Sequence, residues 1–128
     1  GAIVNIGSVS AERPAPTVAA YGAAKAALAN FTRTIGQEWL PKVRSNLVTV
    51  GMVRTESAHL HYGDEEGVRR TGERIPIGRL ANPEEIGNVC LFLASPLASY
   101  VSGSTIQVHG GGDWPPFLDT PYHDARQP

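Results

Sequence analysis

The chain of 128 residues has a single cysteine and no excess of charge of either sign. One cysteine cannot form a disulfide within the chain. Cys90 falls in an apolar helical pattern, so we expect a packed thiol in a protein of the reducing cytoplasm. The formal net charge is −1, with lysines and arginines scattered along the chain. Without a basic stripe, the sequence lacks the electrostatic footprint of a nucleic-acid-binding protein.

The sequence also lacks long hydrophobic runs. No apolar stretch approaches the roughly 18 residues that a membrane-spanning helix needs. The apolar first residues lack the basic segment and the cleavage site of a signal peptide. We therefore expect no membrane partner.

What the sequence contains is an alternation of strand and helix patterns. Short apolar runs rich in β-branched residues predict three strands, at residues 2–6, 46–50 and 105–109. A helical pattern occupies residues 17–40, and another begins after Asn82, a residue typical of an N-cap. This alternation predicts an α/β protein with one open parallel sheet and right-handed crossovers.

The spacing of the apolar residues predicts which face of each helix is buried. In the first helix the expected buried residues are Ala24, Ala27, Leu28, Phe31 and Ile35. In the second they are Ile86, Val89, Cys90 and Leu93. The continuous apolar run at residues 2–6 favours a strand that is buried on both faces.

Ser8, Tyr21 and Lys25 form the most informative pattern. The i, i+4 spacing places a phenol and an ammonium on one helix face, and Ser8 follows the first predicted strand. A positive charge favours the phenolate form of a tyrosine, which can then exchange a proton with an alcohol or carbonyl oxygen held by a serine hydroxyl. None of these groups accepts hydride, so a cofactor is needed. Singly, each has an ordinary structural interpretation, but together they predict a proton-transfer site.

Four motifs, in this order, resemble the short-chain dehydrogenase/reductase family. They are Ile-Val-Asn-Ile-Gly-Ser ending at Ser8, Tyr-x-x-x-Lys starting at Tyr21, Ser-Asn-Leu-Val-Thr-Val-Gly ending at Gly51, and Gly-Ser-Thr-Ile-Gln-Val-His-Gly-Gly ending at Gly111. The resemblance implies the C-terminal half of a Rossmann-type doubly wound parallel sheet over residues 1–113, with three strands and flanking helices, and a tail at 114–128. It also implies an oxidoreductase that uses NAD or NADP to interconvert a secondary alcohol and a ketone, both small molecules.

The same resemblance assigns roles to the three side chains. Tyr21 is expected to be the general acid/base and to contact the cofactor. Lys25 is expected to favour the phenolate and to hold the nicotinamide ribose. Ser8 is expected to position the reacting oxygen.

The resemblance also implies that the loop after the second strand contacts the cofactor. The matching residues are Gly51, Met52, Val53 and Thr55, with the backbone of Val53 meeting the nicotinamide carboxamide. Val50 stands where the family usually has proline. A residue other than proline frees φ and restores a backbone N–H, which predicts a looser loop.

Several landmarks of the family are not among these residues. The glycine-rich phosphate-binding turn, the residue that selects the cofactor and the catalytic asparagine are all absent, so we expect half of a dehydrogenase, and NAD and NADP remain equal alternatives. The alternative function is a truncated, non-catalytic module for interaction or oligomerisation, because the first strand would have an open β edge.

The family commonly forms tetramers through the Tyr-x-x-x-Lys helix and the last strand, which implies a homo-oligomer, either a tetramer or a dimer. In the tail, Trp114 and Phe117 are expected to pack over the rim of the sheet or on a neighbouring subunit.

Residues 56–74 are polar and have no continuous apolar stripe, which predicts a mobile lid over the substrate. In this lid His59, His61 and Tyr62 either contact the substrate or form a solvated surface. Two histidines without a third ligand at a suitable spacing predict no metal site. The acidic run that starts at Asp64 favours a solvated helix start over a pair of catalytic carboxylates.

Overall fold

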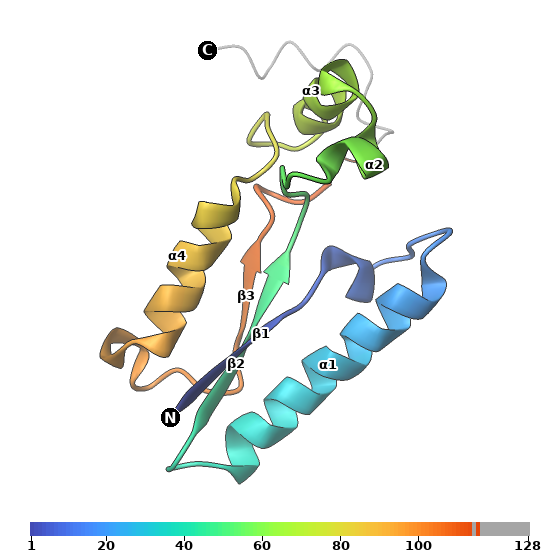
Figure 1. Ribbon diagram of the computed structural model, residues 1–128. Helices are drawn as coiled ribbons and strands as arrows, with labels where there is room; N and C mark the ends of the chain where they lie inside the picture. Colours follow the sequence, from blue (N-terminus) through green and yellow to red (C-terminus); the bar gives the residue numbers. More distant parts are fainter. Residues whose placement is uncertain (114, 116–128) are drawn as a thin grey trace.

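Three parallel strands form the centre of the molecule. The computed structural model describes residues 1–113 and 115. Strands β1 (Ala2–Ile6), β2 (Arg44–Val50) and β3 (Thr105–Val108) pair in the order β1-β2-β3 (Figure 1). Val4 lies opposite Asn46, and Val48 lies opposite Ile106. The predicted open parallel sheet is confirmed, with β2 starting two residues earlier and β3 ending one residue earlier than expected.

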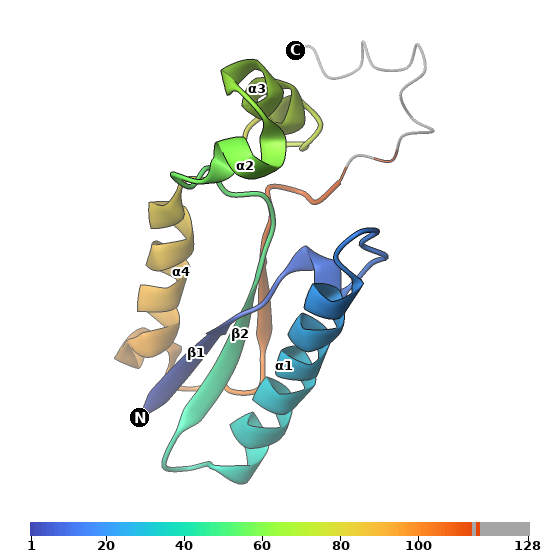
Figure 2. The same cartoon turned by 45° about the vertical axis from the view of Figure 1, so that its right-hand side comes forward.

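Helices cover both faces of this sheet. Helix α1 (Ala19–Glu38) lies on one face and α4 (Pro83–Ala94) on the other, as the two views in Figures 1 and 2 show. On the α4 side, Val48, Leu93 and Ala98 are fully buried. Packed against this cluster are Ile86, Val89 and Cys90 of α4, so the predicted apolar stripe of that helix is confirmed.

The buried face of α1 differs from the expected one. Ile35 is buried as expected and Leu28 is half-buried, but Ala24, Ala27 and Phe31 are exposed. The buried positions are instead Gly22, Thr32, Ile35 and Gly36. A Cβ added to Gly36 would lie 2.7 Å from the Gly103 Cα, so α1 approaches the neighbouring backbone too closely for a larger side chain. The helix therefore packs along a strip of small residues that a search for large apolar side chains misses.

The start of α4 follows the sequence expectation. Asn82 is the N-cap, Pro83 is the first helical residue, and Asn82 and Glu85 form a capping box. The Glu85 carboxylate accepts the backbone N–H of Asn82 at 2.8 Å and also pairs with the Arg79 guanidinium at 2.7 Å. These contacts satisfy donors that a helix start leaves unpaired.

Strand β1 lies at one edge of the sheet. Its outer residues Ala2 and Ile6 are exposed, and Ile6 keeps 42% of its surface accessible. The expectation that this strand is buried on both faces is therefore wrong for its two ends. Within the described residues β1 pairs only with β2, so no described strand covers its other side.

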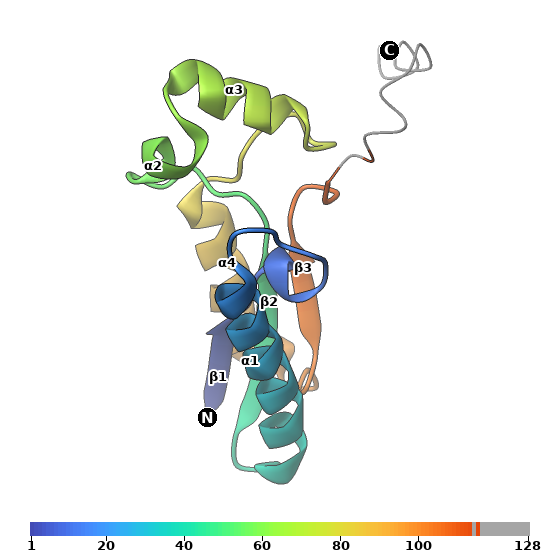
Figure 3. The same ribbon diagram turned by 90° about the vertical axis from the view of Figure 1, so that its right-hand side faces the viewer.

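The segment predicted as a lid contains two short helices, α2 (Ala58–Tyr62) and α3 (Glu65–Glu73). Figure 3 shows both beyond the carboxyl ends of the strands. The side chain of Asp64 caps α3 by accepting the Gly67 N–H at 2.9 Å, which confirms the predicted helix start.

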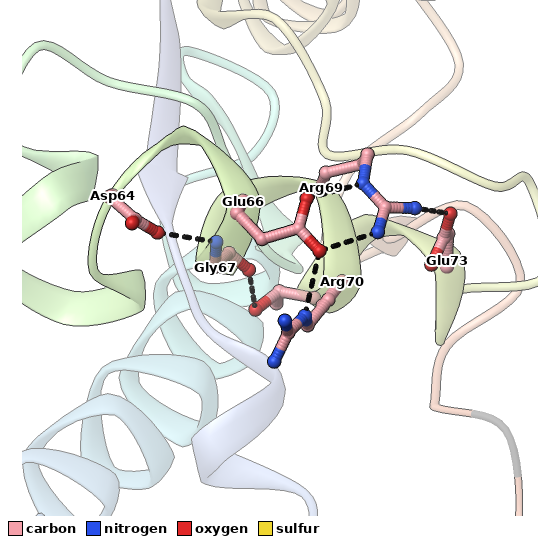
Figure 4. A network of polar contacts seen from close by, with 7 residues as sticks. Asp64, Glu66, Gly67, Arg69, Arg70 and Glu73 are labelled. Atoms are coloured by element: carbon pink, nitrogen blue, oxygen red, sulfur yellow. Dashed lines mark hydrogen bonds and ion pairs between the residues drawn. The ribbon is translucent and has the colours of Figure 1, made fainter.

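Charged side chains form a chain of ion pairs on the surface of α3. Glu66 accepts hydrogen bonds from Arg69 and Arg70, and Arg69 also pairs with Glu73 (Figure 4). The hydrogen bonds from Arg69 and Arg70 lower the pKa of Glu66 to about 2. Exposed ion pairs of this kind contribute little to the stability of the protein. They stabilise helix α3 locally and do not indicate a functional site.

Among the residues that the structure describes, no helix is both long and apolar enough to cross a membrane. The expected packing of Trp114 and Phe117 lies outside the described residues.

Candidate active site

The carboxyl ends of the three strands bring the expected site residues to one rim of the sheet. Ser8 follows β1, Gly51 follows β2 and Gly110 follows β3. The strands are parallel, so these three positions lie at the same end. Open α/β sheets bind ligands at this end.

Ser8 is held in a short turn. It is the N-cap of a single 3-10 turn, η1 (Val9–Ala11), and only 9% of its surface is exposed. Its Oγ accepts the backbone N–H of Ser10 at 3.2 Å. The hydroxyl proton remains available, so Ser8 can donate a hydrogen bond to an oxygen at the rim.

Tyr21 and Lys25 meet on one face of α1. The Lys25 Nζ lies 5.6 Å from the centroid of the Tyr21 ring, within the range of a cation–π contact. The same Nζ donates a hydrogen bond of 2.8 Å to the carbonyl oxygen of Ile6, at the end of β1. Tyr21 is half exposed, at 49%. The ammonium is thus fixed between the helix and the strand that precedes Ser8, with the phenol open to a ligand.

The turn that carries Ser8 packs against the helix turn that carries Tyr21. A Cβ added to Gly22 would lie 2.7 Å from the carbonyl oxygen of Ser10. Only glycine permits this approach without displacing one backbone from the other. The structure therefore brings the Ser8 turn into contact with α1 at the residue beside Tyr21.

The loop after β2 is held by backbone pairing. The N–H of Gly51 donates to Val108, Ala81 donates to Met52, and Arg54 donates back to Ala81 at 2.8 Å. Val50, which stands where the family usually has proline, lies inside β2 and pairs with Val108, and the looser loop expected from it stays a prediction.

Several backbone donors of the same loop are unused within residues 1–113, at Met52, Val53, Glu56 and Ser57. Within residues 1–113, the N–H of Val53 has no hydrogen-bond partner, while the Val53 carbonyl accepts the N–H of Thr55 at 3.1 Å. An unpaired N–H at the rim of the sheet fits the amide oxygen of a nicotinamide cofactor.

The lid contains one aromatic side chain that interacts electrostatically with Tyr21. Tyr62 ends α2 and is half-buried. Burial raises the pKa of Tyr62, and an electrostatic interaction with Tyr21 raises it further. Of the three lid residues considered from the sequence, Tyr62 is the half-buried one, whereas both histidines are exposed.

The two lid histidines are exposed, and the Nδ1 of His59 contacts the carbonyl oxygen of Glu56 at 3.1 Å. The described residues contain no group of three or more His, Cys, Asp or Glu side chains able to hold a metal ion.

Glu12 is a residue of this rim that the sequence did not indicate. Its carboxylate accepts hydrogen bonds from Thr49 on β2 and Gln107 on β3, which are 37 and 95 residues away along the chain. No motif or local spacing links residues at such separations. Only the strand order reveals the contact.

Comparison with known proteins identifies the family. A family model described as enoyl-(acyl carrier protein) reductase matches residues 1–113. The chain belongs to the short-chain dehydrogenase/reductase family. The chain is 40% identical over 112 residues, 87% of its length, to the 3-oxoacyl-(acyl-carrier-protein) reductase of Aquifex aeolicus, covering 44% of that protein. It is 39% identical over 120 residues, 87% of its length, to the 2,3-dihydro-2,3-dihydroxybenzoate dehydrogenase of Escherichia coli, covering 48% of that protein.

Solved structures of this family share the fold. A short-chain dehydrogenase/reductase of Brucella melitensis matches 87% of this chain with 40% identity and a TM-score of 0.79, over 44% of its own length. An NADPH-bound short-chain oxidoreductase of Pseudomonas aeruginosa matches 88% of this chain with 36% identity and a TM-score of 0.79, over 46% of its own length. The fold is therefore the C-terminal half of a Rossmann-type doubly wound sheet, and the chain spans less than half the length of these relatives.

Proposed function

We propose that this chain carries the proton-transfer half of an NAD(P)-dependent oxidoreductase that interconverts a secondary alcohol and a ketone. The observation that carries the proposal is the placement of the Lys25 ammonium, 5.6 Å from the Tyr21 ring and hydrogen-bonded to the end of β1. This arrangement puts a fixed positive charge beside a half-exposed phenol at the ligand-binding rim.

The side chains act in the following way. Tyr21 takes the hydroxyl proton of the alcohol in one direction and returns a proton to the carbonyl oxygen in the other. Lys25 stabilises the phenolate that Tyr21 needs in order to accept that proton. Ser8 donates a hydrogen bond to the same substrate oxygen and fixes its position as charge develops on it. The short-chain dehydrogenase/reductase relatives support these roles at the level of the family.

The residues present also fit a nicotinamide cofactor. The Val53 N–H is an available donor for the carboxamide, and the Lys25 ammonium and the Tyr21 hydroxyl would hold the ribose hydroxyls. Gly51, Met52 and Thr55 complete the loop on which the cofactor would rest. When bound, the nicotinamide supplies the hydride acceptor or donor that no side chain of this chain provides.

We further infer a homo-oligomer, a tetramer or a dimer, in the cytoplasm. The exposed outer face of α1 supports association, because Phe31 keeps 52% of its surface accessible among exposed alanines.

The substitution Tyr21→Phe tests the proposed role. In the protein at its natural length, we expect a loss of turnover of roughly 10²–10⁴-fold, because the ring remains but the proton donor is removed. Thermal unfolding should be unchanged, since the phenol is half exposed. Nicotinamide absorbance measures turnover over a panel of ketones and secondary alcohols.

Tyr100→Phe is the matched control, because it removes the hydroxyl of a fully exposed tyrosine far along the chain. It should keep full turnover. Full activity in Tyr21→Phe would refute the assignment of Tyr21 as the general acid/base.

A second candidate function rests on the open edge of β1. Alternation along the strand directs the Gly7 N–H to Val48 of β2 and therefore directs the N–H of Val4 to the open side. An edge with unused donors and acceptors can add a strand from another polypeptide. In this alternative the chain acts as an interaction module.

A further inference from the structure

The geometry points to Glu12 as a positioning residue that fixes the turn carrying Ser8 against the ends of β2 and β3. This inference rests on the proposed function for the role of Ser8, but the geometry of the turn can be tested without it. Glu12 directly follows η1, whose N-cap is Ser8.

Each oxygen of the Glu12 carboxylate binds a different strand. Its Oε1 accepts the Thr49 hydroxyl of β2 at 2.9 Å, and its Oε2 accepts the Gln107 side-chain amide of β3 at 3.0 Å. Thr49 is 1% exposed, so the first hydrogen bond is anchored in the buried part of the sheet. The Gln107 Oε1 lies 2.6 Å from the His109 Nε2, which orients the amide nitrogen toward Glu12. One carboxylate thus bridges two strands and the turn.

The next residue adds a second connection in the same direction. The Arg13 side chain pairs with Asp113 beyond β3, with a nitrogen–oxygen distance of 2.6 Å. Both side chains of this pair are more than 40% exposed, so solvent weakens the pair. Glu12 and Gln107 are also exposed, but the other partner of Glu12, Thr49, is buried, so the Glu12–Thr49 hydrogen bond is shielded from solvent on one side.

The opposite side of the turn is set by α1. There the Ser10 carbonyl touches Gly22, which prevents the turn from moving toward the helix. Glu12 prevents movement away from the sheet, and the Ser10 N–H holds the Ser8 Oγ. The contacts with Gly22 and with Glu12 together restrict the position of the turn. The position of the turn in this way sets the orientation of the Ser8 hydroxyl.

Two substitutions of Glu12 distinguish the effect of losing its hydrogen bonds from the effect of losing its negative charge. Glu12→Ala removes both acceptors. Glu12→Gln keeps both contacts, because the amide oxygen can accept from Gln107 while the amide nitrogen donates to the Thr49 hydroxyl, which can accept as well as donate. Glu38→Ala, an exposed carboxylate at the end of α1, is the control for loss of an acidic side chain.

Backbone order parameters from nitrogen-15 relaxation report the result on the chain itself. In Glu12→Ala we expect the order parameters of Val9, Ser10 and Ala11 to fall from about 0.85 to below about 0.6, with no change at Val48. Glu12→Gln and Glu38→Ala should retain the original values. Unchanged values at Ser10 in Glu12→Ala, or an equal fall at Val48, would overturn the inference.

Turnover gives a second, independent readout. In the protein at its natural length, we expect Glu12→Ala to lower kcat about 10–100-fold with KM unchanged, and Glu12→Gln to restore it. A rise of KM alone would contradict positioning of Ser8. If Tyr21→Phe retains full activity, the proposed chemistry fails, but the order parameters still decide whether Glu12 holds the turn.

Discussion

Two neighbouring residues in the buried centre of β2 differ in how their polar atoms are satisfied. The Asn46 amide donates to the Val101 carbonyl at 2.8 Å and accepts the Ser104 N–H at 3.0 Å. It therefore fastens the loop before β3 to β2. The Ser45 hydroxyl, which is equally buried, has no partner in the described part of the chain.

This contrast predicts opposite effects of removing the two side chains. Asn46→Ala should lower the free energy of unfolding by about 1–3 kcal/mol, because the Ser104 N–H loses its partner and the Val101 carbonyl keeps only its hydrogen bond from Arg44. Ser45→Ala should leave it unchanged or slightly raised, since it removes a buried hydroxyl that bonds nothing. Urea unfolding followed by circular dichroism measures both. An equal loss in the two variants would show that the Ser45 hydroxyl has a partner, such as a buried water.

At the scale of single elements, α1 and α4 use glycine differently. Gly36 of α1 faces the Gly103 backbone and the Ser45 carbonyl, and an added Cβ would lie 2.7 Å and 2.9 Å from them. Gly87 of α4 has no atom within 4 Å of an added Cβ. The first glycine permits close packing of helix on sheet, whereas the second lies on the exposed surface.

We therefore predict opposite signs for the same substitution in the two helices. Gly36→Ala should destabilise the protein by about 1–3 kcal/mol, because the backbones must separate. Gly87→Ala should stabilise it by about 0.5–1 kcal/mol through the higher helix propensity of alanine. Thermal and urea unfolding of the pair provide the comparison. Stabilisation by Gly36→Ala would mean that α1 does not contact the Gly103 loop as described.

The start of α4 predicts a dependence of stability on pH. Hydrogen bonds from the Arg79 side chain and the Asn82 backbone lower the pKa of Glu85 to about 2, from 4.5. A lowered pKa stabilises the folded state above pH 4.5, and this contribution is lost as the pH falls from about 4.5 to about 2.

Glu85→Gln should reduce the unfolding free energy at neutral pH and flatten its decrease between about pH 4.5 and pH 2. The amide oxygen introduced at position 85 still accepts the Asn82 N–H, so the helix cap is preserved. The substitution therefore removes only the negative charge. Glu84→Gln, at the adjacent exposed position, is the control and should keep the slope. Urea titrations at several pH values measure the difference, and parallel curves for Glu85→Gln and the original protein would contradict the prediction.

At the scale of the whole molecule, the sheet is covered on both faces and open along β1. Helices α1 and α4 protect the faces (Figure 2), whereas β1, among residues 1–113 and 115, has a neighbouring strand on one side only. Lys25 caps one carbonyl of this edge, that of Ile6. The remainder of the edge is a surface on which another strand can pair.

Val4→Pro tests this edge without breaking the existing sheet. The Val4 N–H points away from β2, so proline removes a donor from the open side only. We expect the original chain to show a rise of mass with concentration in sedimentation experiments, and Val4→Pro to stay monomeric with an unchanged circular dichroism spectrum. Val4→Ile, which keeps the N–H, is the control. Unaltered assembly of Val4→Pro, or a monomeric original chain, would count against edge pairing.

Features that depend on neighbours in the sequence could be predicted from the sequence alone. The three strands, the capped start of α4, its buried stripe and the helix start at Asp64 all follow from periodicity and from side chains within four residues of one another. The four ordered motifs likewise identified the family, which the match over residues 1–113 confirms.

Features that depend on contacts between distant segments were decided by the tertiary structure. The buried face of α1 follows from how closely Gly36 lets the helix approach the backbone of Gly103, and the position of the loop after β2 follows from hydrogen bonds with Ala81 and Val108. The contact of Glu12 with β2 and β3 exists only because the sheet order places these strands beside the Ser8 turn. Local patterns determine which elements form, whereas close packing and hydrogen bonds across the sheet determine which side chains meet.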